Sequence, residues 1–318
     1  MLCRVADSLF WMSRYLERAE NQARFIDVTS SIALGYRGSE QALWSSLLHA
    51  GGDVEAFLQR YAAPTRENII NFLLFDRRNL NSVISCLTAA RENARSVREA
   101  LTAPLWEAVN RFYLRVRTDT TQQPQILKQP HQFLERIKRS AHQVLGVREA
   151  TWSHGDSWHF STLGYQLERA DKTSRILDVR YFLLLPVMNT GSEQLDVVQW
   201  AALLESTGAL QMYRRKWGPI QPNRVLDFLV LNPAFPRSLR FCIQATETAL
   251  RSISGNTSTE PQNEAEALVA DMSRRLATLT AEEIVSTGLH PFIDQFQTTL
   301  NQIGAAISTA YFQIPTPE

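Results

Sequence analysis

The chain repeats hydrophobic residues at helical spacing from one end to the other. In the N-terminal segment, apolar and small residues recur every three or four positions, at Leu9, Met12, Leu16, Ala19, Ala23 and Ile26. Near the C-terminus the same spacing connects Phe292, Phe296, Leu300, Ile303, Ala306 and Ala310. Such a period places the residues on one face of an α-helix. The sequence contains no alternating β-branched run of the kind that predicts a strand.

We therefore predict an all-α fold of about a dozen helices. Clusters of glycine, proline and polar residues mark the expected breaks between helices. These include Gly35–Gly38, Asp76–Asn81, Pro124–Pro130 and Pro186–Gly191. Of these, Pro124–Pro130 is the only plausible linker, and amphipathic sequence follows it at once.

Two segments of the chain repeat one sequence pattern. Residues 16–28 read LERAENQARFIDV and residues 167–179 read LERADKTSRILDV, with seven of the thirteen positions identical. Downstream, a constant offset of 156 residues aligns Trp44 with Trp200, Phe72 with Phe228, and Cys86 with Cys242. A shared order of residues at constant spacing indicates an internal duplication.

The duplication predicts the domain organisation. We expect one compact helical bundle over residues 1–318, in which residues 1–100 and 152–254 form two halves related by a pseudo-twofold axis. Residues 101–151 would supply linking helices, and residues 260–314 would supply the C-terminal helices. Core packing explains most duplicated apolar positions. The side chains predicted to be buried are Trp44, Leu47, Phe72, Trp200, Leu203 and Phe228.

A row of charged residues follows the apolar stripe of each repeated helix. At 3.6 residues per turn the row lies about 100° around from the stripe, a partly shielded position beside a neighbouring helix. The candidate site takes in this row and nearby polar residues, namely Arg14, Glu17, Arg18, Glu20, Asn21, Arg24, Asp27, Glu168, Arg169, Asp171, Arg175 and Asp178. Small residues beside the row would let a second helix approach closely, at Ala19, Ala23, Ala170 and Ser174.

Two interpretations of the charged row remain open. In the structural one, the two helices cross and an ion-pair network between the halves fixes their geometry. That network would comprise Glu17, Arg24, Glu168 and Arg175. The i,i+4 order of Glu20–Arg24 and of Asp171–Arg175 also favours a pair within each helix. In the other, the same residues line a cleft that binds a polar ligand. A large pocket between the helices would favour the ligand, and tight packing would favour the network.

The two motif arginines bear on this choice. Arg18 and Arg169 lie about 200° around from the apolar stripe, where a solvent-facing helix accepts any polar residue. Both copies nevertheless have arginine there. This agreement between the copies favours a role that needs the guanidinium.

Other chemistries have weaker support in the sequence. Di-iron bundles use Glu-x-x-His pairs, which neither repeated helix contains. Arg24 and Arg175 would also repel a cation, so we expect neither a metal nor a cofactor. The group His154, Asp156 and His159 lies at an expected helix start, where capping explains it. Cys86 and Cys242 are expected to be buried small residues and not nucleophiles.

Charge and composition limit which kinds of partner and which cellular compartment we expect. The chain has 33 Lys+Arg against 32 Asp+Glu, a net charge of +1, so neither a nucleic acid nor an anionic membrane is an expected partner. Charged residues interrupt the N-terminus, and the apolar cluster at 181–188 is too short to span a bilayer. Three cysteines without close spacing indicate a reducing compartment. We therefore expect a cytoplasmic protein.

The repeated segments also resemble a known family. The stretch FWMSRYLERAENQARFIDV, its second copy LERADKTSRILDV, and the pair FLLFD…NS and FLVLNPAFPRS resemble the bacterial alpha-E family, a helical domain named for its Glu-Arg motif. The motif corresponds to Glu17-Arg18 and to Glu168-Arg169. The resemblance implies association with a circularly permuted ATP-grasp ligase, and often with a transglutaminase-like protease, in systems proposed to make or attach peptide-like amide bonds.

Three classes of function follow from this resemblance. The first is a non-catalytic partner that docks the ligase and binds or presents its peptide-like or amino-acid-like substrate. The sequence favours it, because it contains no phosphate-binding loop or recognisable nucleophile motif. The second is an enzyme of the same pathway that uses the Glu-Arg cleft for acid–base chemistry, which a carboxylate with a strongly raised pKa would support. The third is a structural scaffold that forms a homodimer.

Overall fold

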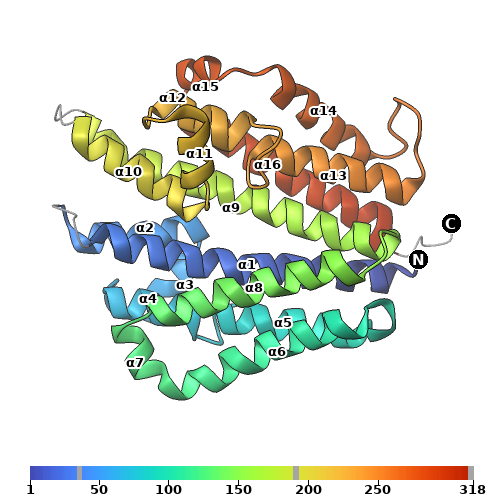
Figure 1. Cartoon of the computed structure of the whole chain (residues 1–318), viewed down its shortest axis with the longest axis horizontal. Helices are drawn as coiled ribbons and strands as arrows, with labels where there is room; N and C mark the ends of the chain where they lie inside the picture. Colours follow the sequence, from blue (N-terminus) through green and yellow to red (C-terminus); the bar gives the residue numbers. More distant parts are fainter. Residues whose placement is uncertain (34–37, 189–192, 314–318) are drawn as a thin grey trace.

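All regular secondary structure in the described part of the chain is helical, which confirms the predicted class (Figure 1). The computed structural model describes residues 1–33, 38–188 and 193–313, and the side chains among them except at 50, 179–188 and 193–196. The helices are α1 (Cys3–Ala33), α2 (Glu40–Gly51), α3 (Val54–Leu58), α4 (Arg66–Leu74), α5 (Val83–Ser96), α6 (Ala103–Asp119), α7 (Gln123–Lys128), α8 (His131–Thr151), α9 (Asp156–Met188), α10 (Glu193–Ser206), α11 (Leu210–Trp217), α12 (Pro222–Leu226), α13 (Leu239–Ser254), α14 (Glu264–Thr278), α15 (Ala281–Thr287) and α16 (Leu289–Ile307). Single 3₁₀ turns occupy Arg98–Ala100 and Thr120–Gln122, and π-helical turns occupy Asp227–Leu231 and Ser308–Phe312.

Two of the expected breaks differ from the structure. The segment 124–130 contains the short helix α7, because a proline in the first turn lacks only an N–H that has no partner within the helix. Helix α9 continues past Pro186 to Met188, although a proline inside a helix cannot donate the backbone hydrogen bond at its own position. Residues 189–191 of that expected break, and residues 35–37 of the first, lie outside the described residues.

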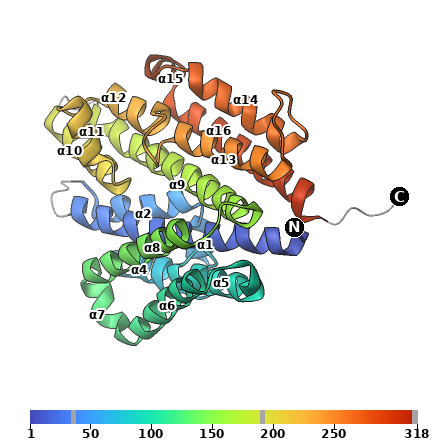
Figure 2. The ribbon, with the colours of Figure 1, turned by 45° about the vertical axis from the view of Figure 1, so that its right-hand side comes forward.

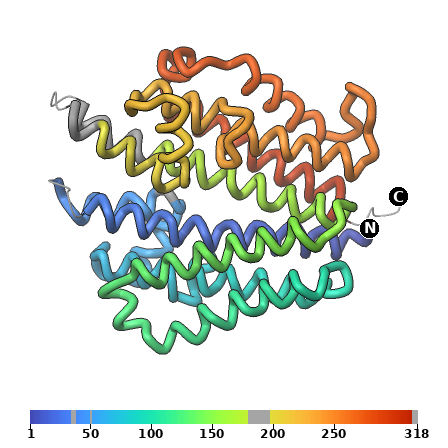
Figure 3. Tube along the Cα trace, in the orientation of Figure 1, coloured from blue at the N-terminus to red at the C-terminus, as the bar shows by residue number. Residues whose placement is uncertain are grey.

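Helices α1 and α9 lie side by side at the centre of the fold and run in the same direction (Figures 1 and 2). Helices α5 and α8 pack against α1, whereas α13 and α16 pack against α9. Helix α6 covers α5 and α8, and α14 covers α13 and α16. The two ends of the described chain meet, as the trace in Figure 3 shows, with the Cys3 thiol 3.8 Å from the carbonyl oxygen of Gln313. The α1–α9 contact therefore joins the two sides of the molecule.

Small residues allow α1 and α9 to approach closely. A Cβ atom at Gly164 would lie 2.1 Å from the carbonyl oxygen of Phe10, so only glycine fits there. One turn away, the hydroxyl oxygens of Ser13 and Ser161 are 2.7 Å apart. Ala19 and Ala170 are fully buried, as expected for residues that let a second helix approach.

Several local contacts recur at aligned positions of the two repeats. Ser82 and Ser238 each cap a helix by accepting a backbone N–H three residues later. Gly52 and Gly208 each follow a helix with a φ close to +70°, a conformation that glycine adopts without strain. Phe57 packs edge-on against Phe72, and Tyr213 does the same against Phe228. Equivalent residues thus make equivalent contacts.

The six apolar side chains predicted to form the core are all buried. Their exposed fractions are 1% for Trp44, 7% for Leu47, 0% for Phe72, 3% for Trp200, 0% for Leu203 and 3% for Phe228. The repeated apolar positions are therefore core positions, as predicted.

We expect Phe72→Ala and Phe228→Ala each to lower the free energy of unfolding by about 3–5 kcal/mol, because each removes buried surface and leaves a cavity. Denaturant titration of the purified variants measures this loss. Leu80→Ala is the matched control, since Leu80 is 78% exposed and its truncation should cost less than about 0.5 kcal/mol. A loss below about 1 kcal/mol for either phenylalanine would contradict the assignment to the core.

Candidate functional site

The two Glu-Arg motifs pair reciprocally across the contact between α1 and α9. Arg169 donates from Nε to Oε1 of Glu17 at 3.0 Å and from a terminal nitrogen to Oε2 at 2.9 Å. In the same way, Arg18 donates to the two carboxylate oxygens of Glu168 at 2.6 and 2.9 Å. Each guanidinium therefore grips the carboxylate of the other helix in the two-point geometry that suits this pair.

The four paired residues are shielded from solvent. The side chains of Glu17 and Glu168 are 1% and 0% exposed, and those of Arg169 and Arg18 are 9% and 15% exposed. No gap large enough for a ligand separates these hydrogen-bonded partners. The geometry matches the structural interpretation, in which the motif helices pack shut.

Further residues complete the coordination of the two carboxylates. Arg237, just before α13, donates to Glu17 at 2.8 Å and to Glu20 at 2.7 Å. On the other side, Glu168 accepts a hydrogen bond from Arg14 at 2.9 Å and lies 3.4 Å from the Lys172 ammonium. Each motif glutamate is thus surrounded by more than one cation.

The expected positions of the motif arginines were wrong. Arg18 and Arg169 were placed on a solvent-facing side of their helices, yet both are inside. The reason is that α1 has neighbours on several sides, in α5, α8 and α9, and α9 has α1, α13 and α16. Such central helices have little solvent-facing surface, so their polar rows are also enclosed.

The expected network also differed in its partners. Arg24 and Arg175 were expected to join the network between the halves and, from their i,i+4 spacing, to pair with an acidic residue of their own helix; the pairs within each helix are present. Arg24 donates to Glu20 at 2.6 Å, and Arg175 donates to Asp171 at 2.9 Å. This i,i+4 spacing brings such side chains together on one helix, and the arginine one residue after each motif glutamate makes the crossing contact instead.

The remaining predicted residues connect the central helices to their neighbours. Asn21 donates to the Glu17 side chain at 3.0 Å. Asp27 bonds to His131 and Lys138 of α8, each at 2.7 Å. The contacts of Asp27 attach α1 to α8, whereas the Asn21 bond lies within α1.

In the second copy, Asp178 lies 2.7 Å from His290 of α16. Two predicted residues, Arg14 and Asp171, also reach a cavity of about 230 Å³ between α1, α9 and α16. The predicted set therefore separates into a buried centre and a rim.

Electrostatics keep the buried groups charged. Burial alone would raise the pKa of Glu17, but Arg169 and Arg237 outweigh it and hold this pKa below the ordinary range. For Glu168 burial acts the same way, and Arg18, Lys172 and Arg14 hold its pKa well below the ordinary range. Both glutamates are carboxylates at neutral pH, so they are hydrogen-bond acceptors and not general acids.

Several residues of the network were missed in the sequence, namely Asn81, Asp53, Arg237, Lys172 and His142. Asn81 accepts from Arg18 at 2.9 Å and donates to Asp53 at 3.0 Å, while Arg237 binds Glu17. Burial raises the pKa of the Asp53 carboxyl. Asn81 and Arg237 occupy aligned positions, directly before the repeated Ser82 and Ser238. That shared position was a signal for them, whereas nothing in the sequence pattern singled out Asp53.

The two repeated cysteines are buried, as predicted. Cys86 and Cys242 are 0% exposed, and burial raises the pKa of each thiol to about 12. They are therefore thiols at neutral pH, the form that is a poor nucleophile. In the part of the chain that the structure describes, no three His, Cys, Asp or Glu side chains are grouped to hold a metal ion.

The fold and the centre define a helical domain built on two reciprocally paired Glu-Arg motifs. Residues 1–312 match the family called Alpha-E, which is described as a predicted alpha-helical domain with a conserved ER motif, and the chain belongs to that family. The reciprocal pairs in this chain are Glu17 with Arg169 and Glu168 with Arg18.

Curated relatives of the chain are uncharacterised mycobacterial proteins. One from Mycobacterium bovis and one from Mycobacterium tuberculosis CDC 1551 are each 24% identical over 300 residues, which is 88% of this chain and 33% of each relative. A further one, from Mycobacterium tuberculosis H37Rv, is 23% identical over the same shares. The chain thus spans about a third of the length of these relatives. No solved structure matches it, and no described helix is long and apolar enough to cross a membrane.

A double-mutant cycle should reveal strong coupling between Glu17 and Arg169. We expect Glu17→Gln and Arg169→Gln each to cost about 3–5 kcal/mol, because each leaves a buried charge without its partner. The double variant should lose clearly less than the sum, and denaturant titration of all four proteins measures the difference. Asp271 and Arg274 form the control pair, since both are more than three-quarters exposed and should couple by less than about 1 kcal/mol. Additive losses at the buried pair would contradict the pairing.

Stability should also fall in acid. A carboxylate whose pKa is lowered by folding stabilises the protein fully above its ordinary pKa and loses that contribution as the pH falls towards the folded-state value. For Glu17 and Glu168 the ordinary value is 4.5. We therefore expect the Tm to decline progressively below about pH 4.5. Thermal melts between pH 7 and pH 3 measure this, and Glu168→Gln should show a shallower decline than the parent. An identical decline in the two proteins would assign the acid sensitivity to other groups.

Proposed function

We propose that this protein is a non-catalytic partner of an ATP-grasp amide or peptide ligase, and that its Glu-Arg motifs are structural. The structural role of the motifs is supported by the two-point pairing of all four motif residues, which leaves none of these charges for a substrate. The family resemblance supports the ligase as the partner. The greater length of the mycobacterial relatives is consistent with a domain that works alongside others.

We also propose that the two repeats form halves related by a pseudo-twofold axis. Under that operation Glu17–Arg169 becomes Glu168–Arg18, and the contact of Gly164 with Phe10 becomes the contact of Ser13 with Ser161. The equivalent serine caps and aromatic pairs support the same relation. The free cysteines support the cytoplasm as the compartment.

One observation favours a second function, the binding of an amino-acid-like ligand. The cavity at the rim has a volume of about 230 Å³, below the ~300 Å³ typical of sites for drug-sized molecules. It is lined by aromatic, apolar and polar side chains together with the oppositely charged Arg14 and Asp171, which also pair with Glu168 and Arg175. Such a pair of charges suits a small zwitterion, which would make the cavity a substrate-presenting or enzymatic site of the same pathway.

Co-expression with a circularly permuted ATP-grasp ligase tests the partnership. We expect the two proteins to co-purify, and ATP-dependent amide formation by the ligase to increase when this protein is present. The double variant Arg18→Lys with Arg169→Lys keeps the charges but loses the two-point grip. On our proposal its Tm falls by ~5 °C or more, because several charge-assisted hydrogen bonds are lost, while ligation per folded protein stays unchanged.

Two further variants separate the alternatives. Arg274→Lys is the control for the lysine exchange. Arg274 is exposed, so this variant should have the same Tm as the parent protein. Gly304→Leu places a side chain at the rim cavity, and a Cβ atom there meets no neighbour within 4 Å. If Gly304→Leu abolishes ligation in a folded protein, the rim cavity is the functional site. Absence of co-purification and of any effect on ligation would reject the partnership.

A further inference from the structure

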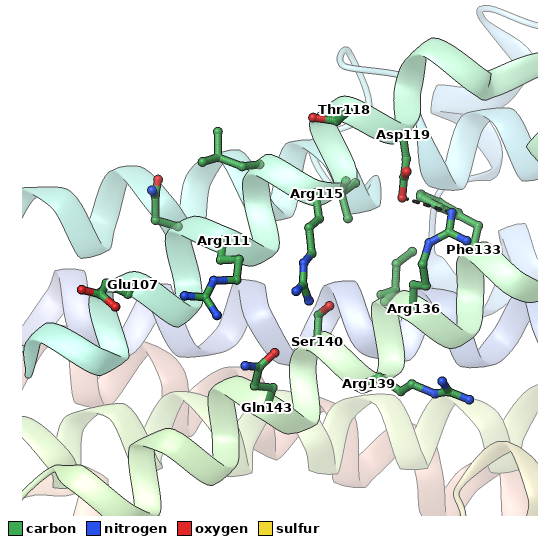
Figure 4. A pocket seen from close by; sticks show the side chains of 14 residues that line it. Glu107, Arg111, Arg115, Thr118, Asp119, Phe133, Arg136, Arg139, Ser140 and Gln143 are labelled. Carbon is green, nitrogen blue, oxygen red and sulfur yellow. Dashed lines mark hydrogen bonds and ion pairs between the residues drawn. The ribbon is translucent and has the colours of Figure 1, made fainter.

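A wide groove opens between α6 and α8, on the side of α8 that faces away from α9. Its volume is about 720 Å³, and Figure 4 shows its lining side chains. The groove extends from Glu107 to Asp119 along α6, about 18 Å at the rise of an α-helix. None of the motif residues lines it.

Four arginines surround this groove. Arg111 and Arg115 extend from α6 towards α8, while Arg136 and Arg139 come from α8 (Figure 4). Two acidic residues also line it, Glu107 and Asp119, so its lining has an excess of positive charge although the whole chain is nearly neutral.

These arginines are only partly neutralised. Arg136 bonds to Asp119 at 3.2 Å, and Arg139 lies 4.0 Å from Glu135. Within the described residues, Arg111 and Arg115 have neither an ion pair nor a side-chain hydrogen bond. Gathering like charges in one groove is unfavourable unless an anion offsets them. The arrangement is therefore complementary to a ligand that bears several negative charges.

The groove also has an apolar component. Phe133 and Ile137 form its buried floor, and Leu114 at its edge is 43% exposed. A side chain of a bound peptide could cover Leu114 while its carboxylates reach the guanidiniums of Arg111 and Arg115. These two arginines are one helical turn apart, which matches acidic residues spaced by one turn on a facing helix.

We propose that the α6–α8 groove binds an acidic amphipathic segment of a partner protein. Arginine suits such a segment because its planar fork grips a carboxylate at two points. A nucleic acid fits less well, because its uniformly charged backbone would meet Glu107 and Asp119. This site is separate from the Glu-Arg centre, and the proposal holds whether or not the partner is a ligase.

A defined peptide tests the groove directly. The probe is a fluorescein-labelled sixteen-residue helical peptide with glutamate at i,i+4 positions on one face and leucine beside it. A peptide with lysine in place of glutamate and a single-stranded DNA of sixteen nucleotides are the comparison probes. Fluorescence anisotropy measures Kd at two salt concentrations, because charge pairing weakens as salt increases.

The decisive variant is Arg111→Glu with Arg115→Glu, which reverses two exposed charges in the groove. Arg214→Glu with Arg215→Glu is the matched control. It makes the same change of net charge at exposed residues of α11, on the opposite side of the molecule in Figures 1 and 2. We expect the groove variant to weaken binding of the acidic peptide at least tenfold, and the control variant less than twofold. Leu114→Asp should also weaken binding, which tests the apolar contact.

Three results would overturn the proposal. The first is no saturable binding of the acidic peptide to the parent protein. The second is an equal loss of affinity in the groove and control variants, which would reveal only a general charge effect. The third is tighter binding of the DNA than of the acidic peptide, abolished by the groove variant, which would make the groove a nucleic-acid site. Circular dichroism melts of each variant check that the protein remains folded.

Discussion

The reciprocal burial of Glu17 with Arg169 and of Glu168 with Arg18 is the constraint on which the helix arrangement depends. Removing charged groups from water costs several kcal/mol per ion, and only well-aligned partners offset this cost. A shift of one residue along either helix would turn its side chains by about 100° and separate these partners. The pairs therefore select one register of α1 against α9. Gly164 allows the close approach that this register requires.

The same network extends from the central pair into the surrounding helices. Arg237 connects the start of α13 to Glu17, and Asn81 connects the turn before α5 to Arg18. His142 of α8 contacts Glu20 at 3.0 Å. Because the motif charges are used in these contacts, our proposals assign the recognition of other molecules to the periphery. The rim cavity and the α6–α8 groove are two such peripheral features, and both have charged linings.

Prediction from the sequence succeeded where one local pattern determined the outcome. Helical periodicity was sufficient for the all-α class, and the repeated apolar positions such as Trp44 and Phe228 were sufficient for the core. The sequence did not predict correctly which sides of α1 and α9 face solvent, because a helix surrounded by neighbours has no side left for solvent. Arg18 and Arg169 were consequently assigned to the wrong environment. The pairs Glu20–Arg24 and Asp171–Arg175 did form within single helices, as their i,i+4 spacing favoured.

The sequence by itself determined the helical class, the repeat, the core and the residue types of the central motif. These follow from spacing along a single helix, which depends on local geometry. Only the tertiary structure decided that each glutamate pairs with the arginine of the other copy, that Arg237 and Asn81 join them, and that Arg111 and Arg115 face a groove with α8. Those facts depend on how helices far apart in the chain cross. Crossing is set by close packing and by the need of every buried charge for a partner.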